Sequence, residues 1–273
     1  MNQSLRLRVL ATAITLLVSA TACDKLRARD QLNKGVQSYK NTKYEEAIDH
    51  FQQAVSLDPS LLNARLYLAT AFAQQYIPAA DSQENNHMAE QAIEQFKRVL
   101  DVRPSHEQQI SSLKGIASLY LNMHKLDLAK EYQNRVTAAD PNDPEAYYSI
   151  GVIDWTLAYQ PDMEERGKLG LRADDAVEDK KVCGTLRARN AEWVADGLNN
   201  LNKALQLRPD YDDAMAYVNL LYRQKADIEC DPAASMADLK TAQVWVDKTM
   251  AAKKAKAEKQ PGAAGITLDQ ATN

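Results

Sequence analysis

Four histidines and three cysteines are the residues best suited to metal, thiol or imidazole chemistry. The histidines form no H-E-x-x-H helix and have no cysteine pair at zinc spacing beside them; they are His50, His87, His106 and His124. No G-x-x-x-x-G-K-[ST] loop occurs that would cradle a phosphate. We therefore expect no metal site, no cofactor and no catalytic residue.

Acidic clusters at residues 162–165, 174–179 and 210–213 are the remaining candidate ligands. A calcium loop needs alternating oxygen ligands around a glycine and a closing glutamate, and residues 174–179 lack that order. We interpret the three clusters as solvated loops or helix N-termini, where the helix dipole favours carboxylates.

The N-terminus has the three parts of an export signal. Two arginines lie among the first eight residues, an uncharged apolar run covers residues 9–18, and small residues 19–22 precede Cys23. The apolar run is too short to span a bilayer as a mature helix. Its end resembles a bacterial lipoprotein signal, which implies a diacylglycerol on the cysteine. The alternatives are ordinary cleavage after Ala22 and an uncleaved anchor.

We therefore predict a lipoprotein-type signal peptide over residues 1–22 and lipidation of Cys23. The protein is then exported to the periplasmic side of a bacterial membrane, or is otherwise soluble in the periplasm. Several buried acyl methylenes, at roughly 0.8 kcal/mol each, would hold the chain on a membrane surface.

Composition indicates helices. The 273 residues are 45% hydrophobic and 26% charged, as in soluble globular proteins. Only nine glycines and nine prolines interrupt a chain rich in straight-chain residues, which favours helix over strand. The formal charge of −4 supplies no basic field, so nucleic acid is not an expected partner.

Residues 31–59 have the pattern of an antiparallel helical hairpin. Leu32, Val36 and Tyr39 form one apolar stripe at helical spacing, a second stripe follows a polar turn, and Pro59 ends the second helix. The segment resembles a tetratricopeptide repeat (TPR) through Gly35, Tyr44, Ala47, Phe51, Ala54 and Asp58-Pro59. The family's early tryptophan is absent, and Gln31 stands in its place. The resemblance implies an all-α, right-handed solenoid of about five hairpins over residues 31–250.

The hairpins carry extra residues. Helix-ending prolines lie 45, 37 and 68 residues apart, at Pro59, Pro104, Pro141 and Pro209, whereas the TPR period is about 34. We predict insertions between paired helices near residues 73–86, 156–189 and 225–235, forming a crest along one edge. A degenerate repeat within residues 156–190 is the alternative. Residues 23–30 are expected to be a linker. Residues 251–273 are expected to be a Lys/Ala-rich and disordered tail, whose first part could continue as helix up to Pro261-Gly262 and whose last dozen residues are disordered.

Cys183 and Cys230 remain if Cys23 is lipidated, an even count that favours a disulfide in an oxidising compartment. The two cysteines lie in the insertions of adjacent hairpins, in segments that we expect to be exposed loops. Stacking of these hairpins would bring the cysteines together. Two free thiols are the alternative.

In the TPR family the first helix of each hairpin lines a concave groove. At helical spacing its exposed face should offer aromatic, amide and cationic side chains, which suit an extended peptide; they are Tyr39, Lys40, Asn63, Thr70, Lys114, Asn122, Tyr148, Trp155 and Arg223. They do not reproduce the family's carboxylate clamp. Packing of Tyr148 and Trp155 against the next hairpin is the alternative.

These features predict a non-catalytic, lipid-anchored scaffold of the bacterial cell envelope that presents its groove to an envelope protein or peptide. A binding module for a cell-wall or polysaccharide ligand is the second hypothesis. An enzyme with its site in the insertions is the third.

Overall fold

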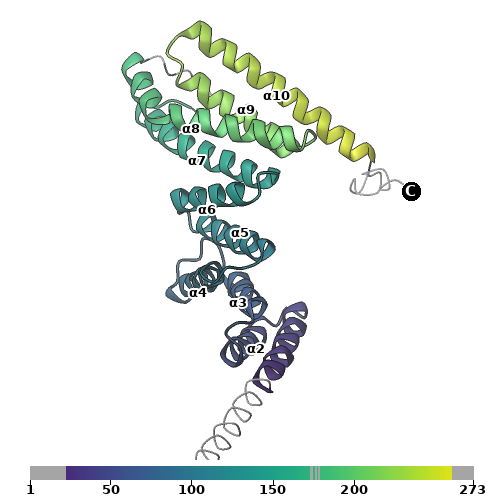
Figure 1. Cartoon of the computed structure of the whole chain (residues 1–273). Coiled ribbons are helices and arrows are strands. Elements are labelled where there is room, and N and C mark those ends of the chain that lie inside the picture. Colours follow the sequence, from purple (N-terminus) through teal and green to yellow (C-terminus); the bar gives the residue numbers. More distant parts are fainter. Residues whose placement is uncertain (1–22, 173–174, 176, 178, 260–273) are drawn as a thin grey trace, which may run out of the picture. The chain divides into compact units, whose positions relative to one another are not determined.

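The computed structural model describes residues 23–172, 175, 177 and 179–259 (Figure 1). The signal over residues 1–22 and the end of the tail, residues 260–273, lie outside this range. Within it the structure is helical, without strands. A helix over residues 23–40 is followed by α2 (Tyr44–Leu57), α3 (Leu62–Gln75), α4 (Gln83–Leu100), α5 (His106–Asn122), α6 (Leu126–Ala139), α7 (Pro144–Leu169), α8 (Lys180–Leu207), α9 (Asp212–Asp227) and α10 (Pro232–Lys259). The order of helices joined by short turns confirms the all-α fold of helical hairpins.

The chain forms two compact units, residues 1–132 and 133–273, whose boundary falls within α6.

Small residues opposite large ones set the helix packing of the first unit. A Cβ on Gly35 would lie 2.5 Å from the ring of Phe51 on α2, and one on Gly115 of α5 would lie 2.6 Å from the ring of Phe96 on α4. Both rings are buried. The two glycines therefore let neighbouring helices approach closely enough to enclose an aromatic ring.

The expected insertion at residues 73–86 is a short loop fixed to α4. Only residues 76–82 are non-helical. The buried Asn85 side chain accepts a hydrogen bond from the Ile77 amide (2.7 Å) and donates to the carbonyls of Ile77 and Ala80 (2.8 Å each). This one amide satisfies three backbone groups, which holds the loop against the helix instead of leaving it to project as a crest.

In the second unit the extra residues lie within the hairpins, as expected, but they do not form the expected crest of loops. α7 has 26 residues and α8 has 28, so residues 156–189 mainly lengthen one hairpin and do not form a hidden repeat. α9 ends at Asp227 and α10 begins at Pro232, so little of the expected insertion at 225–235 is loop. Extending a helix satisfies its backbone groups internally, and the extra residues therefore lengthen helices instead of forming exposed loops.

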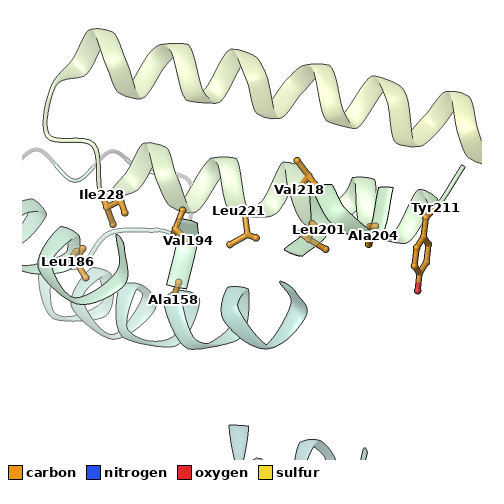
Figure 2. Packing of buried hydrophobic residues seen from close by; sticks show 10 residues of the cluster. Ala158, Leu186, Val194, Leu201, Ala204, Tyr211, Val218, Leu221 and Ile228 are labelled. Atoms are coloured by element: carbon orange, nitrogen blue, oxygen red, sulfur yellow. The ribbon is translucent and has the colours of Figure 1, made fainter. Parts of the chain in front are cut away.

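The core of the second unit lies where α9 packs on α7 and α8 (Figure 2). Leu201 of α8 and Leu221 of α9 are fully buried in it. Glycines again allow the close approach, because a Cβ on Gly151 would lie 2.5 Å from Leu201 and one on Gly197 would lie 2.8 Å from Leu221.

The start of the chain differs from the linker that we expect, whereas the Lys/Ala-rich segment from Ala251 continues as helix. Residues 23–30 are helical and continue without a break to residue 40; the Asp30–Lys34 ion pair (2.7 Å) at i,i+4 supports this helix. The first part of the tail, as far as Lys259, belongs to α10, in agreement with the helical continuation expected there. In the described part of the chain, no helix is long and apolar enough to cross a membrane.

Candidate functional site

A groove of about 710 Å³ lies between α3 and α5 of the first unit. Residues at three- and four-residue spacing form its two walls, so one face of each helix points into it. The wall on α3 consists of Asn63, Leu66, Tyr67, Thr70, Ala73 and Gln74. The wall on α5 consists of Glu107, Gln108, Ser111, Gly115, Ser118, Leu119 and Asn122, with the preceding Ser105.

Aromatic rings supply the apolar part of this groove. Tyr67 is 40% exposed and stacks on Phe51, with ring centroids 5.5 Å apart. Phe96 reaches the groove from α4, where Gly115 leaves room for its ring. Phe96 is only 4% exposed, so Tyr67, held by its stacking on Phe51, offers a ligand most of the preformed aromatic surface.

Amides fix one end of the groove. Gln108 Nε2 donates to Asn63 Oδ1 across the two walls (2.9 Å). Gln108 also belongs to the capping box of α5: Ser105 Oγ accepts from its backbone amide (3.3 Å), and its side chain accepts from the Ser105 amide (3.0 Å). The helix start and the wall contact therefore hold one another in place.

The lining is polar but almost uncharged. Among the described residues that line the groove, Glu107 is the only charged one. A carboxylate clamp requires cations, so this groove is of another kind. Amides and hydroxyls both donate and accept hydrogen bonds, which suits the alternating N–H and C=O groups of an extended peptide.

The structure brings together three of the polar residues that we expected in a groove, namely Asn63, Thr70 and Asn122. The cations lie elsewhere. Lys40 is exposed at the end of the first helix, and Lys114 is half-buried on α5 outside the lining. Tyr39 forms an edge contact with Tyr44 in the first hairpin (5.3 Å between centroids).

The expected groove residues of the second unit pack instead into an aromatic cluster. Tyr217 of α9 makes edge contacts with Tyr148 (5.7 Å) and Trp155 (5.5 Å) of α7. Tyr148 also lies 4.9 Å from Tyr211, and burial raises the pKa of Tyr148 above its usual range. Packing against the next hairpin is therefore the correct alternative for Tyr148 and Trp155. Arg223 is exposed on α9 and donates to Asn219 Oδ1 (3.1 Å).

Helical spacing could have identified the missed lining residues, because Leu66, Tyr67 and Gln74 share one face of α3 with Asn63 and Thr70. The position of Gly115 under Phe96 has no such signal, since it depends on how α5 packs against α4.

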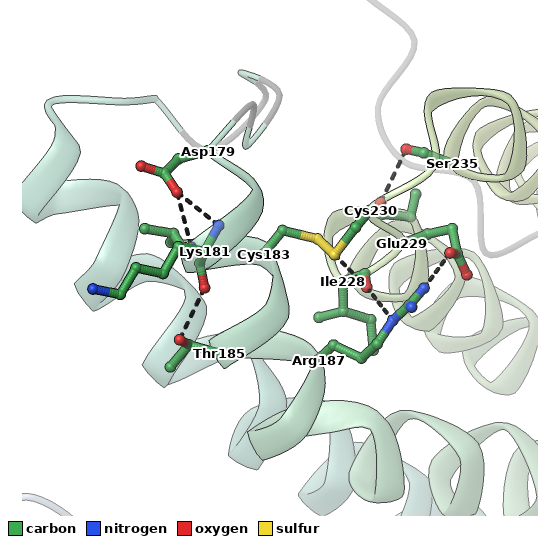
Figure 3. The surroundings of a disulfide bond; sticks show 11 residues. Asp179, Lys181, Cys183, Thr185, Arg187, Ile228, Glu229, Cys230 and Ser235 are labelled. Carbon is green, nitrogen blue, oxygen red and sulfur yellow. Dashed lines mark hydrogen bonds and ion pairs between the residues drawn. A yellow bond between two sulfur atoms is a disulfide. The ribbon is translucent and has the colours of Figure 1, made fainter.

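A disulfide joins Cys183 and Cys230, with Cα atoms 5.8 Å apart (Figure 3). Cys183 is only 2% exposed, in the first turn of α8, so the exposed loop expected around it is wrong. Asp179 caps this helix by accepting from the Lys181 (2.8 Å) and Val182 (3.1 Å) amides. Nearby, Arg187 donates to the Ile228 carbonyl (2.9 Å) and pairs with Glu229. These contacts attach the start of α8 to the α9–α10 connection.

A buried ionic cluster lies in the same unit, where α7 meets the end of α9. Arg166 is fully buried and pairs with Asp162 (2.8 Å) and with Asp227 of α9 (2.8 Å). Its guanidinium also donates to the carbonyls of Arg172 (3.2 Å) and Asp175. Asp162 is thus buried, contrary to the solvated loop expected at residues 162–165. Four oxygen atoms therefore surround the guanidinium group. The cluster holds α7 and the residues after it against the end of α9, which is a role in the packing of the unit.

The other acidic clusters offer no site. Asp212 and Asp213 occupy the first turn of α9, which confirms a helix N-terminus there, while residues 174–179 lie partly outside the described range. The described residues contain no group of three His, Cys, Asp or Glu side chains arranged to hold a metal ion.

The ionic cluster predicts a pH effect. The pKa of Asp227 is raised to about 6: burial is the largest cause, the neighbouring Asp162 also raises the pKa, and Arg166 partly offsets both. The unfolded-state pKa is about 3.9, so the folded state binds this proton more tightly, and the resulting stability is lost as pH rises through 6. Relative to Asp227→Asn, the wild-type unfolding free energy should fall by about 1 kcal/mol from pH 5 to pH 7.

Urea unfolding of the wild-type protein and Asp227→Asn at pH 5, 6 and 7 measures this difference. A constant gap between the two proteins would show that Asp227 does not titrate in this range.

Comparisons with known proteins agree with this hairpin geometry. Family models of the tetratricopeptide repeat match residues 28–61, the first hairpin, and residues 115–143, the third. The chain therefore contains TPR repeats, and such repeats generally serve as protein-interaction scaffolds. No match was found among curated protein sequences.

Solved structures of TPR proteins have a similar fold. A MamA crystal structure is 13% identical, with a TM-score of 0.56, covering 88% of this chain and 98% of its own. MamA from Desulfovibrio magneticus RS-1 is 18% identical, with a TM-score of 0.56, covering 84% and 96%. YrrB, described as a TPR protein with an unusual peptide-binding site, is 16% identical, with a TM-score of 0.50, covering 83% and 90%. At these identities the likeness shows the fold alone.

Proposed function

We propose that this chain is a non-catalytic, protein-binding scaffold of the bacterial cell envelope, anchored by lipid at Cys23. The groove between α3 and α5 binds an extended segment of an envelope protein. The observation that carries this proposal is the groove itself: amides and hydroxyls line both walls beside preformed aromatic surface, and they match the backbone of a peptide.

Two further observations support the proposal. YrrB, a protein of similar fold, is described as having a peptide-binding site. A disulfide such as Cys183–Cys230 persists in oxidising compartments, which fits the export signal at the N-terminus.

Filling the groove tests its role. Ser118 is exposed on the α5 wall, so Ser118→Trp should place a ring where the peptide lies without removing a buried contact. We expect this variant to lose the envelope protein that wild-type protein recovers from native membranes after crosslinking and high-salt washing. Gln53→Trp, at an exposed α2 position outside the groove lining, is the matched control and should retain it.

Equal recovery with both variants would place the binding surface elsewhere. Retention of the delipidated protein on purified cell-wall sacculi, unaffected by Ser118→Trp, would favour the cell-wall ligand instead.

The lipid anchor has its own test. Cys23 is an exposed free thiol at the start of the described chain. Cys23→Ser removes the sulfur that would carry the acyl chains, so the protein should move from the membrane fraction to the soluble periplasmic fraction. Fractionation followed by immunoblotting measures this. A variant whose mass shows that residues 1–22 have been cleaved, and which still stays membrane-bound at high salt, would contradict lipid anchoring.

A further inference from the structure

The last helix of the second unit has an exposed apolar stripe. On α10, Met236 is 53% exposed, Leu239 38% and Met250 66%. With the intervening Gln243 and half-buried Val246 they are spaced three, four, three and four residues apart, the spacing of a helix-pairing seam.

The equivalent residues of α8 indicate the role of this stripe. The buried Ala242 and Thr249 of α10 lie 45 residues after Gly197 and Ala204, which are buried in α8. In that register Leu239, Val246 and Met250 correspond to Val194, Leu201 and Leu205. These three α8 residues pack into the core that α9 helps to form. The stripe on α10 thus corresponds to residues that are covered in α8 by the neighbouring helices α7 and α9, and the described chain supplies no further hairpin after α10 to cover its exposed members.

Charge indicates what covers the stripe. Lys240 and Asp247 are both exposed and flank it on one side. If two α10 helices pair antiparallel, with Leu239 opposite Met250 and Gln243 opposite Val246 of a second copy, each Lys240 comes to face Asp247 of that copy. Two-fold symmetry forms this ion pair twice. A parallel arrangement brings Lys240 beside Ser235 or Ala242 of the other copy and gains no ion pair.

We propose that α10 is a homodimerisation helix, in which the Leu239–Met250 face of one copy pairs antiparallel with the same face of a second copy. Apolar burial at the stripe supplies the attraction, and the two Lys240–Asp247 pairs fix the register and direction. The proposal does not depend on what the α3–α5 groove binds.

A zero-length carbodiimide crosslink tests the pairing in the purified full-length protein. Within one helix Lys240 and Asp247 are about 10 Å apart along the axis, a span that an extended lysine amide-bonded to aspartate can just reach. Mixing ¹⁴N- and ¹⁵N-labelled protein separates the two cases, because a Lys240–Asp247 link between copies yields mixed-isotope crosslinked peptides and a link within one helix does not. We expect a covalent dimer carrying this link.

Variants decide whether the stripe is responsible. Met250→Glu should weaken dimerisation by about tenfold or more, because it introduces two symmetry-related charges into the apolar seam. Ala255→Glu, exposed on α10 but off the stripe and away from Lys240 and Asp247, should not weaken it. Lys240→Glu alone should weaken it through repulsion between Glu and Asp247, and adding Asp247→Lys should restore it.

Sedimentation velocity provides the oligomeric state, and circular dichroism confirms that each variant keeps its helices. Wild-type protein that stays monomeric at tens of micromolar, as expected if residues 260–273 cover the stripe, would overturn the proposal. A dimer insensitive to both Met250→Glu and Lys240→Glu would overturn it too.

Discussion

Arg166→Met is expected to lower the unfolding free energy of the second unit by about 3 to 5 kcal/mol, the largest effect of any single substitution considered. The methionine fills much of the same volume, but it leaves Asp162 buried beside Asp227 with no cation between them. The carbonyls of Arg172 and Asp175 also lose their donor.

Denaturant unfolding followed by circular dichroism measures this loss. Arg172→Met is the matched control, because that side chain is 76% exposed and its ion pair with Asp175 should contribute less than about 1 kcal/mol. Adding Asp162→Asn and Asp227→Asn to Arg166→Met removes the unpaired charges and should recover part of the stability. Similar losses from Arg166→Met and Arg172→Met would contradict a buried ionic role.

Loss of the Cys183–Cys230 disulfide is expected to have the second largest effect, about 2 to 4 kcal/mol. The bond links residues 47 positions apart, so it restricts the unfolded chain considerably. Cys183 is buried, and its replacement by alanine removes little packing volume, so the effect should come mainly from the crosslink.

Unfolding of wild-type protein with and without reductant, beside Cys183→Ala and Cys230→Ala, separates these contributions. Reductant should lower the wild-type stability to that of the variants and leave the variants unchanged. Hydrogen exchange should rise first at the start of α8 and at residues 228–231. Alkylation of both thiols in unreduced protein, seen by mass spectrometry, would rule the disulfide out.

The hairpins were predictable because their packing is local in sequence. In the first hairpin, Gly35 and Phe51 sit on paired helices a fixed distance apart, so the sequence pattern contains the contact itself. The disulfide was predictable for a related reason, since adjacent hairpins bring equivalent segments together. The crest was not, because Asn85 holds one insertion against its helix and α7 and α8 turn another into helix.

The candidate groove was predictable only in part. The helical period placed Asn63 and Asn122 on the correct faces, but it could not show that the equivalent face of α7 is filled by Tyr217 of α9. The ionic cluster, too, could be predicted from the sequence only in part. The spacing of Asp162 and Arg166 was visible on one helix, whereas the pairing with Asp227 depends on tertiary packing of α9 against α7.

Site-specific photo-crosslinking in native membranes tests most directly whether the groove between α3 and α5 binds a protein partner. A photoreactive residue in place of Ser111 or Thr70, one on each wall, should capture the same envelope protein, and Ser118→Trp should abolish both adducts. The same probe in place of Asp101, exposed outside the groove lining, should capture none of it. Equal capture from Asp101, or no protein adduct from either wall, would contradict the groove as the binding site.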